Sequence, residues 1–245
     1  MKESIQLMRN TGTEYFFDFR EQGTRGVTLL KNALQTKGIG AIVFSRPQKY
    51  VYDSEELKWL LENSNGIGVS SISDWEYAEL EKIAHETKRK KKLFALHGSE
   101  AVREDIDQIL ALQPNFLVHM VKATKADLLR VKEENIPIVI CPRSNAFFGL
   151  KPNIHRMKQC GITLMLGTDN AMIQSPNILE ELIYLKQRTK EFSLEDLFHM
   201  ITYTPRKVLN EDAGIQVANH SSPLIVLERE TLKPIYISRN KRGMS

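Results

Sequence analysis

Four short apolar runs in this sequence each end in side chains that could carry out chemistry. The runs are residues 93–96, 116–118, 138–140 and 164–166. The reactive side chains that follow them are His97 with Glu100 three residues later, His119, Cys141 and Asp169. Neutral imidazole and carboxylate groups suit Zn²⁺ or a similar ion, which lowers the pKa of a bound water toward about 7. If the four runs are neighbouring strands, these groups share one site.

Helical segments separate these runs, which predicts parallel strands that end on a common face. The expected strands are residues 15–19, 40–44, 67–70, 93–96, 116–118, 138–140 and 164–166. The expected helices among them are residues 26–34, 54–63, 75–87, 103–112, 125–134 and 153–160. Asp53 and Ser73 occupy N-cap positions, and Gly161 occupies a C-cap position. The alternation predicts an α/β fold of the (β/α) barrel type, whose active site lies at the carboxyl ends of the strands.

Seven strands are one fewer than a closed barrel of this kind needs. Beyond Asp169 the apolar spacing predicts two further helices, residues 177–189 and 194–209, that pack around the barrel. Residues 222–227 and 234–237 then have the pattern of two strands in a smaller appendage. The two edge strands of an open barrel are expected to lack partners on one side, which favours self-association into a homo-oligomer.

The composition excludes several classes of protein. The 245 residues, 42% hydrophobic and 26% charged, can bury one large core. There is no apolar stretch of 18 residues and no apolar signal-peptide core at the start, so neither a membrane span nor secretion is predicted. Cys141 and Cys160 are too few for a disulfide framework, which indicates the reducing cytoplasm. The net charge is +4, and the basic run 88–92 lacks interleaved aromatic residues, which predicts a solvated helix end and no nucleic-acid contact.

The series of motifs at the four strand ends resembles the amidohydrolase superfamily, in its branch of cytosine, guanine and S-adenosylhomocysteine deaminases and chlorohydrolases. The matching motifs are HxxE at His97, a lone histidine at His119, CPxSN from Cys141 to Asn145, and GTDN around Asp169. Any one motif is weak, but four in the right order at this spacing are specific.

The resemblance extends over the chain from about Tyr15 onward. Residues 204–209 match the family's closing helix, and residues 214–215 and 223–226 match its return to a small β-sandwich. The resemblance therefore implies an incomplete amidohydrolase barrel in residues 1–210 and, in residues 211–245, the C-terminal strands of a composite β-sandwich.

The resemblance also implies a role for each matching residue. His97 is expected to be a metal ligand, and Asp169 is expected to touch both the metal and the attacking water. Glu100 is expected to be the general acid and base that passes a proton from this water to the leaving nitrogen. His119 is expected to stabilise the attacked centre without binding the metal. The implied cofactor is a divalent metal, zinc or alternatively iron, and the implied substrate is a small molecule such as a nucleobase-like or nucleoside-like amine.

One motif of the family is absent from this sequence. The first strand of the family's barrel ends in His-x-His, which supplies two metal ligands, and no such pair occurs in the 245 residues. Residues 15–19 correspond to the family's second strand. We therefore expect an N-terminally truncated barrel with an incomplete metal site, in which His119 could substitute as a ligand. Such a chain is expected to bind metal weakly and to lack deaminase activity until a segment with His-x-His is supplied.

Two functions remain open, so the sequence does not decide whether the chain is an enzyme. The first is a metal-dependent hydrolase of non-peptide C–N bonds, of the deaminase type. The alternative is a catalytically inactive barrel that serves as a binding or assembly subunit, because His97 and Asp169 are two protein ligands where catalytic zinc sites generally have three. A phosphotriesterase-like hydrolase fits less well, since it uses a carboxylated lysine at a strand end, and residues 67–70 run into serines.

Several other polar residues have structural interpretations. Asp18 and Arg20 share one face of their strand and are expected either to pair or to line the pocket. Cys141 is expected to be a small buried residue, with Ser144 and Asn145 organising the loop after it. Surface positions are expected for His85, His155 and His220, and a packed position is expected for His199.

Overall fold

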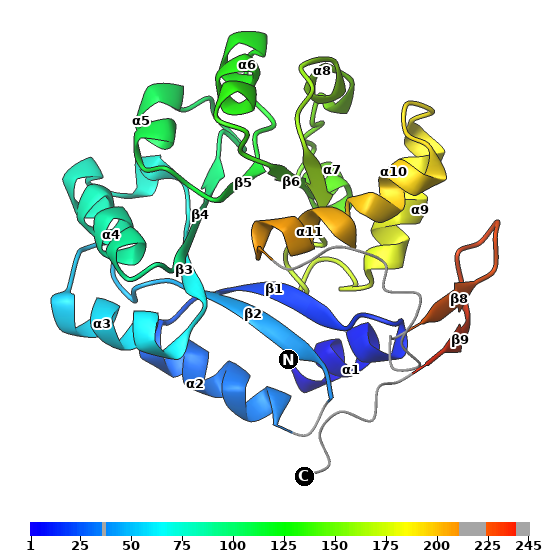
Figure 1. Ribbon diagram of the computed structural model, residues 1–245, viewed down its shortest axis with the longest axis horizontal. Coiled ribbons are helices and arrows are strands. Elements are labelled where there is room, and N and C mark those ends of the chain that lie inside the picture. The colour runs from blue at the N-terminus through cyan, green and yellow to red at the C-terminus, as the bar shows by residue number, and fades with distance from the viewer. Residues whose placement is uncertain (36–37, 211–223, 239–245) are drawn as a thin grey trace.

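Seven parallel strands form one curled sheet in the computed structural model, which describes residues 1–35, 38–210 and 224–238. The strands, in sheet order, are β1 (Tyr15–Arg20), β2 (Gly40–Ser45), β3 (Gly66–Val69), β4 (Leu93–Gly98), β5 (Phe116–His119), β6 (Ile138–Ile140) and β7 (Leu164–Leu166). The sheet bends into an arc that stays open between β1 and β7 (Figure 1). The predicted α/β fold of seven strands, an open relative of the (β/α) barrel, is confirmed.

Helices connect successive strands and cover the outer face of the arc (Figure 1). They are α2 (Gly23–Leu34), α3 (Ser54–Asn63), α4 (Tyr77–Arg89), α5 (Ile106–Ala111), α6 (Lys125–Glu133) and α8 (Ile154–Gln159). The cap predicted at Asp53 is confirmed, because its carboxylate accepts hydrogen bonds from two backbone amides of the first turn of α3. Gly161, with φ +70°, directly follows the C-cap of α8. The prediction for Ser73 is wrong: it lies inside a 3₁₀ helix (Ile72–Asp74), and Glu76 is the N-cap of α4.

Two helices were not expected from the sequence. The first, α1 (Lys2–Asn10), precedes β1 and buries Ile5 and Met8. The second, α7 (Pro142–Phe147), replaces the loop expected after Cys141. Pro142 favours this helix because proline is tolerated in a first helical turn, where an amide hydrogen would have no partner.

The helix expected over residues 194–209 is two helices, α10 (Leu194–His199) and α11 (Tyr203–Val208), which follow α9 (Ile178–Arg188). A continuous helix would place the ring of Pro205 against the carbonyl of Ile201, so the chain restarts just before the proline. The prediction that His199 is packed is therefore wrong. His199 ends α10, and 52% of its side chain is exposed.

Two short strands near the end of the chain, β8 (Ile225–Leu227) and β9 (Pro234–Ile237), pair antiparallel and form a separate small sheet. They confirm the strand pair predicted there, and within the described residues the first strand begins at Ile225. Residues 214–215 and His220 lie outside the described residues, and the predicted division between residues 210 and 211 falls where the described residues stop, so these points stay predictions. No helix in the described part of the chain is long and apolar enough to cross a membrane.

Side chains alternate between two apolar layers along each strand. Those on the outer face pack beneath the helices; those on the inner face fill the arc with Phe44, Ala95, Phe116, Val118, Cys141 and Met165. Phe17 and Phe19 of β1 add their rings to this inner layer, with centroids 5.2–6.0 Å apart in the contacting pairs. The interior of the arc is therefore a packed apolar floor, and polar chemistry is confined to the strand ends.

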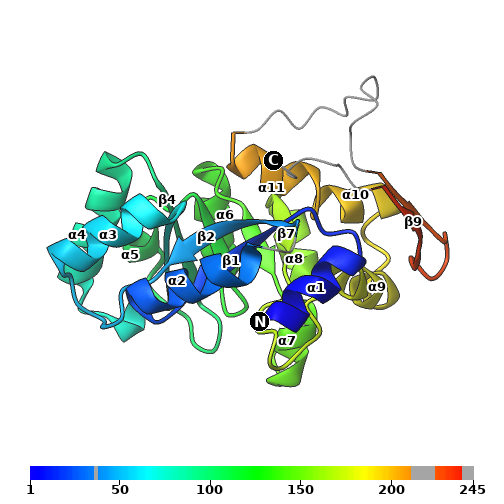
Figure 2. The same ribbon diagram turned by 90° about the horizontal axis from the view of Figure 1, so that it is seen from below.

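Helix α11 lies beside the open side of the arc (Figures 1 and 2). The amide of Leu166 in β7 donates to the carbonyl of Met200 at 3.2 Å. Val208 packs against the inner layer, and Arg206 pairs at 3.2 Å with Glu14, the residue before β1. Within the described residues β1 pairs only with β2 and β7 only with β6, as expected for two edge strands. Self-association through these edges stays a prediction.

An ion pair ties the loop after β4 to helix α6. Asp127, whose side chain is 3% exposed, accepts hydrogen bonds from Arg103 at 2.7 and 2.8 Å and forms a capping box with Thr124. Chiefly because of the hydrogen bond with Arg103, the pKa of Asp127 is lowered from 3.8 to about 2. The charged carboxylate is thus favoured in the folded state.

We predict that Asp127→Asn lowers the free energy of unfolding by about 1–3 kcal/mol at pH 7, the usual range for a lost hydrogen bond to a charged group. A lowered folded-state pKa stabilises above the unfolded pKa, and this contribution is lost as the pH falls toward 2. Urea unfolding should therefore show a difference between variant and parent that shrinks between pH 5 and pH 2.5. Asp107→Asn removes a surface pair with Arg130 and should change stability by less than about 0.5 kcal/mol. Equal effects of the two substitutions would contradict the prediction.

Candidate active site

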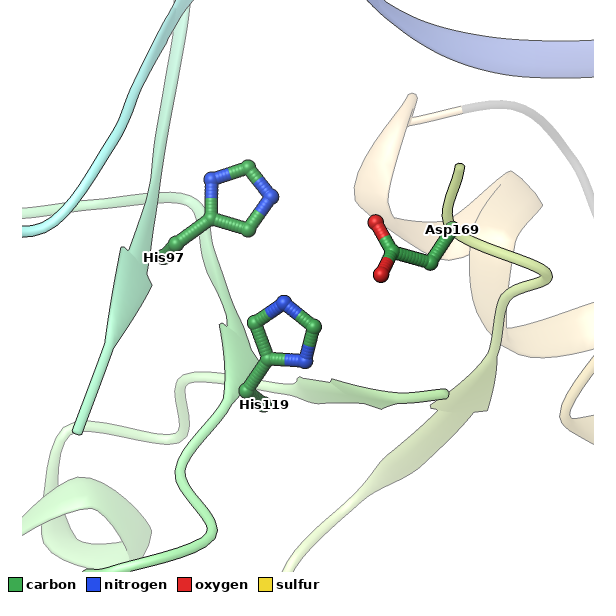
Figure 3. Close-up of side chains that lie close together, drawn as sticks. All are labelled: His97, His119 and Asp169. Carbon is green, nitrogen blue, oxygen red and sulfur yellow. The ribbon is translucent and has the colours of Figure 1, made fainter. Parts of the chain in front are cut away.

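Three side chains predicted for the site lie together at the carboxyl ends of the strands. His97 is the penultimate residue of β4, His119 ends β5, and Asp169 lies just after β7. Figure 3 shows the two imidazole rings and the carboxylate turned toward one another. One nitrogen from each histidine and one oxygen of Asp169 all lie within 4.8 Å of one another. The structure therefore brings together side chains that are up to 72 positions apart in the sequence, the separation of residues 97 and 169.

The alternation of β4 and β7 explains the direction of two of these side chains. Leu93 and Ala95 face the interior of the arc, so His97 continues the same row. Met165 faces inward on β7, and Asp169 follows it at an even spacing. A Cβ atom at Gly167 would lie 3.0 Å from the side chain of Val139, a tight contact that glycine avoids where these strands approach.

The side chain of His119 does not point in the direction that strand alternation predicts, and an unusual backbone conformation turns it toward the site. Phe116 and Val118 face inward, so a regular strand would turn residue 119 outward with Leu117. His119 instead has φ +72° and Met120 has φ +52°, in the left-handed region. Ser99 and Asp169, in the neighbouring loops, have φ +46° and +58°. Residues in this conformation cost about 1–3 kcal/mol each and concentrate at functional sites. They therefore support a functional role for the mouth of the arc, the edge of the sheet where His97, His119 and Asp169 meet.

His97 is held by its second ring nitrogen. Its Nδ1 lies 3.1 Å from the carbonyl oxygen of Val69, which can only accept, so Nδ1 carries the hydrogen and donates. The ring also contacts Phe19 and His119, with centroids 4.8 and 5.2 Å away. Nε2 of His97 is therefore left with a free lone pair directed into the mouth.

The two carboxylates of the site bond to different residues. Glu100 Oε2 lies 3.4 Å from His119 Nε2, and Glu100 Oε1 accepts from Asn145 Nδ2 at 3.1 Å. Asp169 accepts a hydrogen bond from the hydroxyl of Ser144. Ser144 and Asn145 are fully buried in α7. Ser144 and Asn145 were predicted only to organise the segment after Cys141. In the structure they also bond directly to Asp169 and Glu100, which were predicted to take part in chemistry.

Burial changes the protonation of the site. Burial lowers the pKa of His97, and it lowers the pKa of His119 to about 4, with nearby His97 adding to the effect. Burial and the charge of Asp169 raise the pKa of Glu100. Burial also raises the pKa of the Cys141 thiol, which is 2% exposed, as expected for a small buried residue. Neutral imidazoles beside a carboxylate are the forms that bind a divalent cation.

The donor set matches what zinc uses in proteins. Two imidazoles and a carboxylate are a common catalytic set, with metal–ligand distances of about 2.0–2.2 Å. A tetrahedral site with those distances puts ligand atoms about 3.4 Å apart, and the three atoms here lie within 4.8 Å of one another. His97, His119 and Asp169 could therefore hold one ion after side-chain movements of an ångström or so.

Two further networks, not foreseen from the sequence, support the loops that carry these side chains. Glu104 is 7% exposed and accepts from the amides of Ser99 at 2.7 Å and Ser73 at 3.1 Å, and from the hydroxyl of Ser71. Arg143, in α7, donates to Glu181 of α9 at 2.8 Å. The only sign of the Glu104 network in the sequence is a glutamate four residues after Glu100. No local sequence pattern indicates that its side chain folds back to accept from Ser99.

Other residues considered from the sequence lie outside the site. Asp18 and Arg20 pair at 2.5 and 2.8 Å, and Arg20 packs beside Gly26 at the start of α2, so they pair on the outer face and do not line the pocket. His85 and His155 have side chains 76% and 61% exposed, which confirms their predicted surface positions.

Comparisons with known proteins agree with this geometry. The model of the Amidohydrolase family matches residues 1–217. An uncharacterised protein of Methanocaldococcus jannaschii is 34% identical over 236 residues, which cover 88% of this chain and 61% of that protein. A protein of Archaeoglobus fulgidus with the provisional name aminohydrolase is 37% identical over 181 residues, which cover 73% of this chain and 51% of that protein. The chain thus spans about half to three-fifths of the length of these relatives.

Among solved structures, guanine deaminase of C. acetobutylicum with guanine bound has the same fold. It superposes with a TM-score of 0.66 at 16% identity, over 84% of this chain and 61% of that chain. At this level of identity the likeness concerns the fold and leaves the substrate open.

We predict that Glu104→Ala loosens the loop that carries Ser99 and Glu100. Removal of the carboxylate leaves the buried Ser99 amide without its acceptor, which costs about 1–3 kcal/mol. Hydrogen exchange at the Ser99 amide should accelerate at least tenfold, while amides in the middle of β5 keep their protection. Glu133→Ala, at a side chain 70% exposed, serves as the control. Unchanged exchange at Ser99 would show that Glu104 does not hold this loop.

Proposed function

The chain belongs to the amidohydrolase family, and from this we propose that it contributes the catalytic mouth of a metal-dependent hydrolase of non-peptide C–N bonds, of the deaminase type. One observation carries the proposal. The buried imidazole of His119, the half-buried imidazole of His97 and the carboxylates of Asp169 and Glu100 converge at the carboxyl ends of the strands, where barrel enzymes place their catalytic groups.

We assign metal binding to His97 and Asp169. Nε2 of His97 is available because Nδ1 is bonded to Val69, and Ser144 orients the carboxylate of Asp169. When bound, a zinc or iron ion would activate water and polarise the group under attack. His119 lies close enough to serve as a third ligand, but its contacts suit a different role, because its Nε2 faces Glu100 and not the open mouth alone.

Glu100 is the proposed proton carrier. Its raised pKa, caused by burial and by Asp169, brings the carboxyl group closer to the range in which it can both accept and return a proton near neutral pH. It would take a proton from the attacking water and deliver it to the leaving nitrogen. His119 would hold the attacked centre by a hydrogen bond, and the buried floor around Phe19 would exclude bulk water from one side.

The proposed substrate is a small amine of nucleobase or nucleoside type. The support is the family together with the fold of the guanine deaminase, which binds guanine. The alternative is a barrel that binds such a molecule without turning it over.

We predict that the metal-free chain binds one zinc ion and that His97→Asn and Asp169→Asn each weaken this binding at least tenfold. Changes of ten- to a hundredfold follow even from altered partners behind a ligand, so loss of a ligand should reach that size. Competition with a chelator of known affinity measures the constant. His155→Asn, at an exposed histidine, should leave the affinity unchanged. Equal affinity of parent, H97N and D169N would rule out the assigned ligands.

We predict that, once a segment with His-x-His is supplied to the chain, Glu100→Gln retains zinc but lowers the rate of ammonia release about 10²–10⁴-fold, the usual contribution of a general acid and base. The measurement is ammonia release from a panel of nucleobases and nucleosides, with zinc content determined on the same samples. Zinc-loaded parent protein that binds panel members without releasing ammonia would favour the alternative of a binding barrel.

A further inference from the structure

Three consecutive side chains of α7 bond to residues from different parts of the chain. Arg143 donates to Glu181, Ser144 donates to Asp169, and Asn145 contacts Glu100 in the loop after β4 and His119 at the end of β5. Glu181, Ser144 and Asn145 are fully buried. Since a buried polar contact breaks only at a cost, α7 is held firmly against the site, and its side chains can impose geometry on their neighbours.

Asn145 faces two titratable groups at once. Its Nδ2 donates to Glu100 Oε1 at 3.1 Å and lies 3.3 Å from His119 Nδ1. An amide nitrogen is a donor only, so the ring nitrogen opposite it must be the acceptor. In neutral His119 the hydrogen is then on Nε2, which lies 3.4 Å from Glu100 Oε2.

The charge of Glu100 favours this orientation of the amide over the reverse one. With the amide turned around, the oxygen of Asn145 would face Glu100 Oε1, and two acceptors would meet at about 3 Å without a hydrogen between them. In the observed orientation, Oδ1 of Asn145 is buried and has no hydrogen-bond partner among the described residues. The hydrogen bond to the carboxylate therefore favours the observed orientation of the amide.

His97 provides an opposite case in the same site. Its Nδ1 donates to the carbonyl oxygen of Val69, so its hydrogen is on Nδ1 and its Nε2 is free. Two neighbouring imidazoles, with centroids 5.2 Å apart, are thus held by different partners in opposite tautomers. The first tautomer suits a metal ligand, and the second suits a hydrogen-bond donor.

We propose that Asn145 is a positioning residue that keeps His119 in the Nε2–H tautomer and aligns it with Glu100. His119 then presents a hydrogen to the mouth, while His97 presents a lone pair. The catalytic meaning of this arrangement rests on the proposed function, but the tautomer itself does not. Asn145 acts only through Glu100 and His119.

The test is the nitrogen-15 spectrum of the histidine rings in the metal-free chain at pH 8, where an imidazole of ordinary pKa, about 6.5, is neutral. Long-range proton–nitrogen correlations distinguish the two tautomers, and His119→Gln and His97→Gln assign the two rings. We expect the parent to show Nε2–H at His119 and Nδ1–H at His97. Asn145→Asp places a carboxylate opposite Nδ1 and should shift His119 to Nδ1–H or to the doubly protonated ring, while Asn145→Ala should give a mixture of tautomers.

Two controls isolate the effect of Asn145. Ser144→Ala removes an equally buried hydrogen bond from the same helix but should leave His119 as Nε2–H, and His97 should remain Nδ1–H in every Asn145 variant. The proposal is overturned if parent His119 is Nδ1–H, or if Asn145→Ala keeps the single tautomer of the parent. If Asn145→Ala fails to fold, the parent spectrum and Asn145→Asp still decide. These outcomes are independent of any deaminase activity, so a failure here is distinguishable from a failure of the proposed function.

Discussion

The site depends on the pairing of parallel strands at one edge of the sheet. Hydrogen bonds between β4 and β5 align His97 with Val118 and Gly98 with His119, and neighbouring strands of a sheet lie about 4.8 Å apart. The pairing continues through β6 to β7, and the sheet curls, so Asp169 arrives opposite the two histidines. The packed phenylalanines fill the inner side of the curved sheet. A slip of one residue in β4 would turn His97 from the mouth to the helices.

Placing polar groups at this edge is costly, and helix α7 offsets much of the cost. The imidazole of His119 is almost completely buried, and the backbone there adopts a strained left-handed conformation. Asn145 lies 3.3 Å from the buried ring of His119 and donates to Glu100, Ser144 donates to Asp169, and Arg143 anchors the helix to Glu181. Stability and chemistry are therefore coupled, because the contacts that hold the strained loops also decide where hydrogens lie.

The fold of the open arc does not by itself define which reaction its polar residues could catalyse. Many activities share barrel folds, so the function rests on the mouth and not on the sheet. The chain spans about half to three-fifths of the curated relatives it matches, and its own residues supply two imidazoles and two carboxylates to the mouth. Glu14 and Arg206 tie α11 to the beginning of β1 across the open side, so the two ends of the arc are connected by side chains.

The sequence by itself determined the seven strands and the chemical groups at their ends, because apolar runs and the residues that follow them are local features. It did not predict α1, whose buried stripe consists of Ile5 and Met8 alone and is too short to show a period. Nor did it predict the partners of Asn145, which lie 45 and 26 positions away in the chain. Tertiary structure alone decided which polar groups meet, how deeply they are buried and which nitrogen of each histidine carries the hydrogen. These properties depend on distances through space between segments that no local pattern relates.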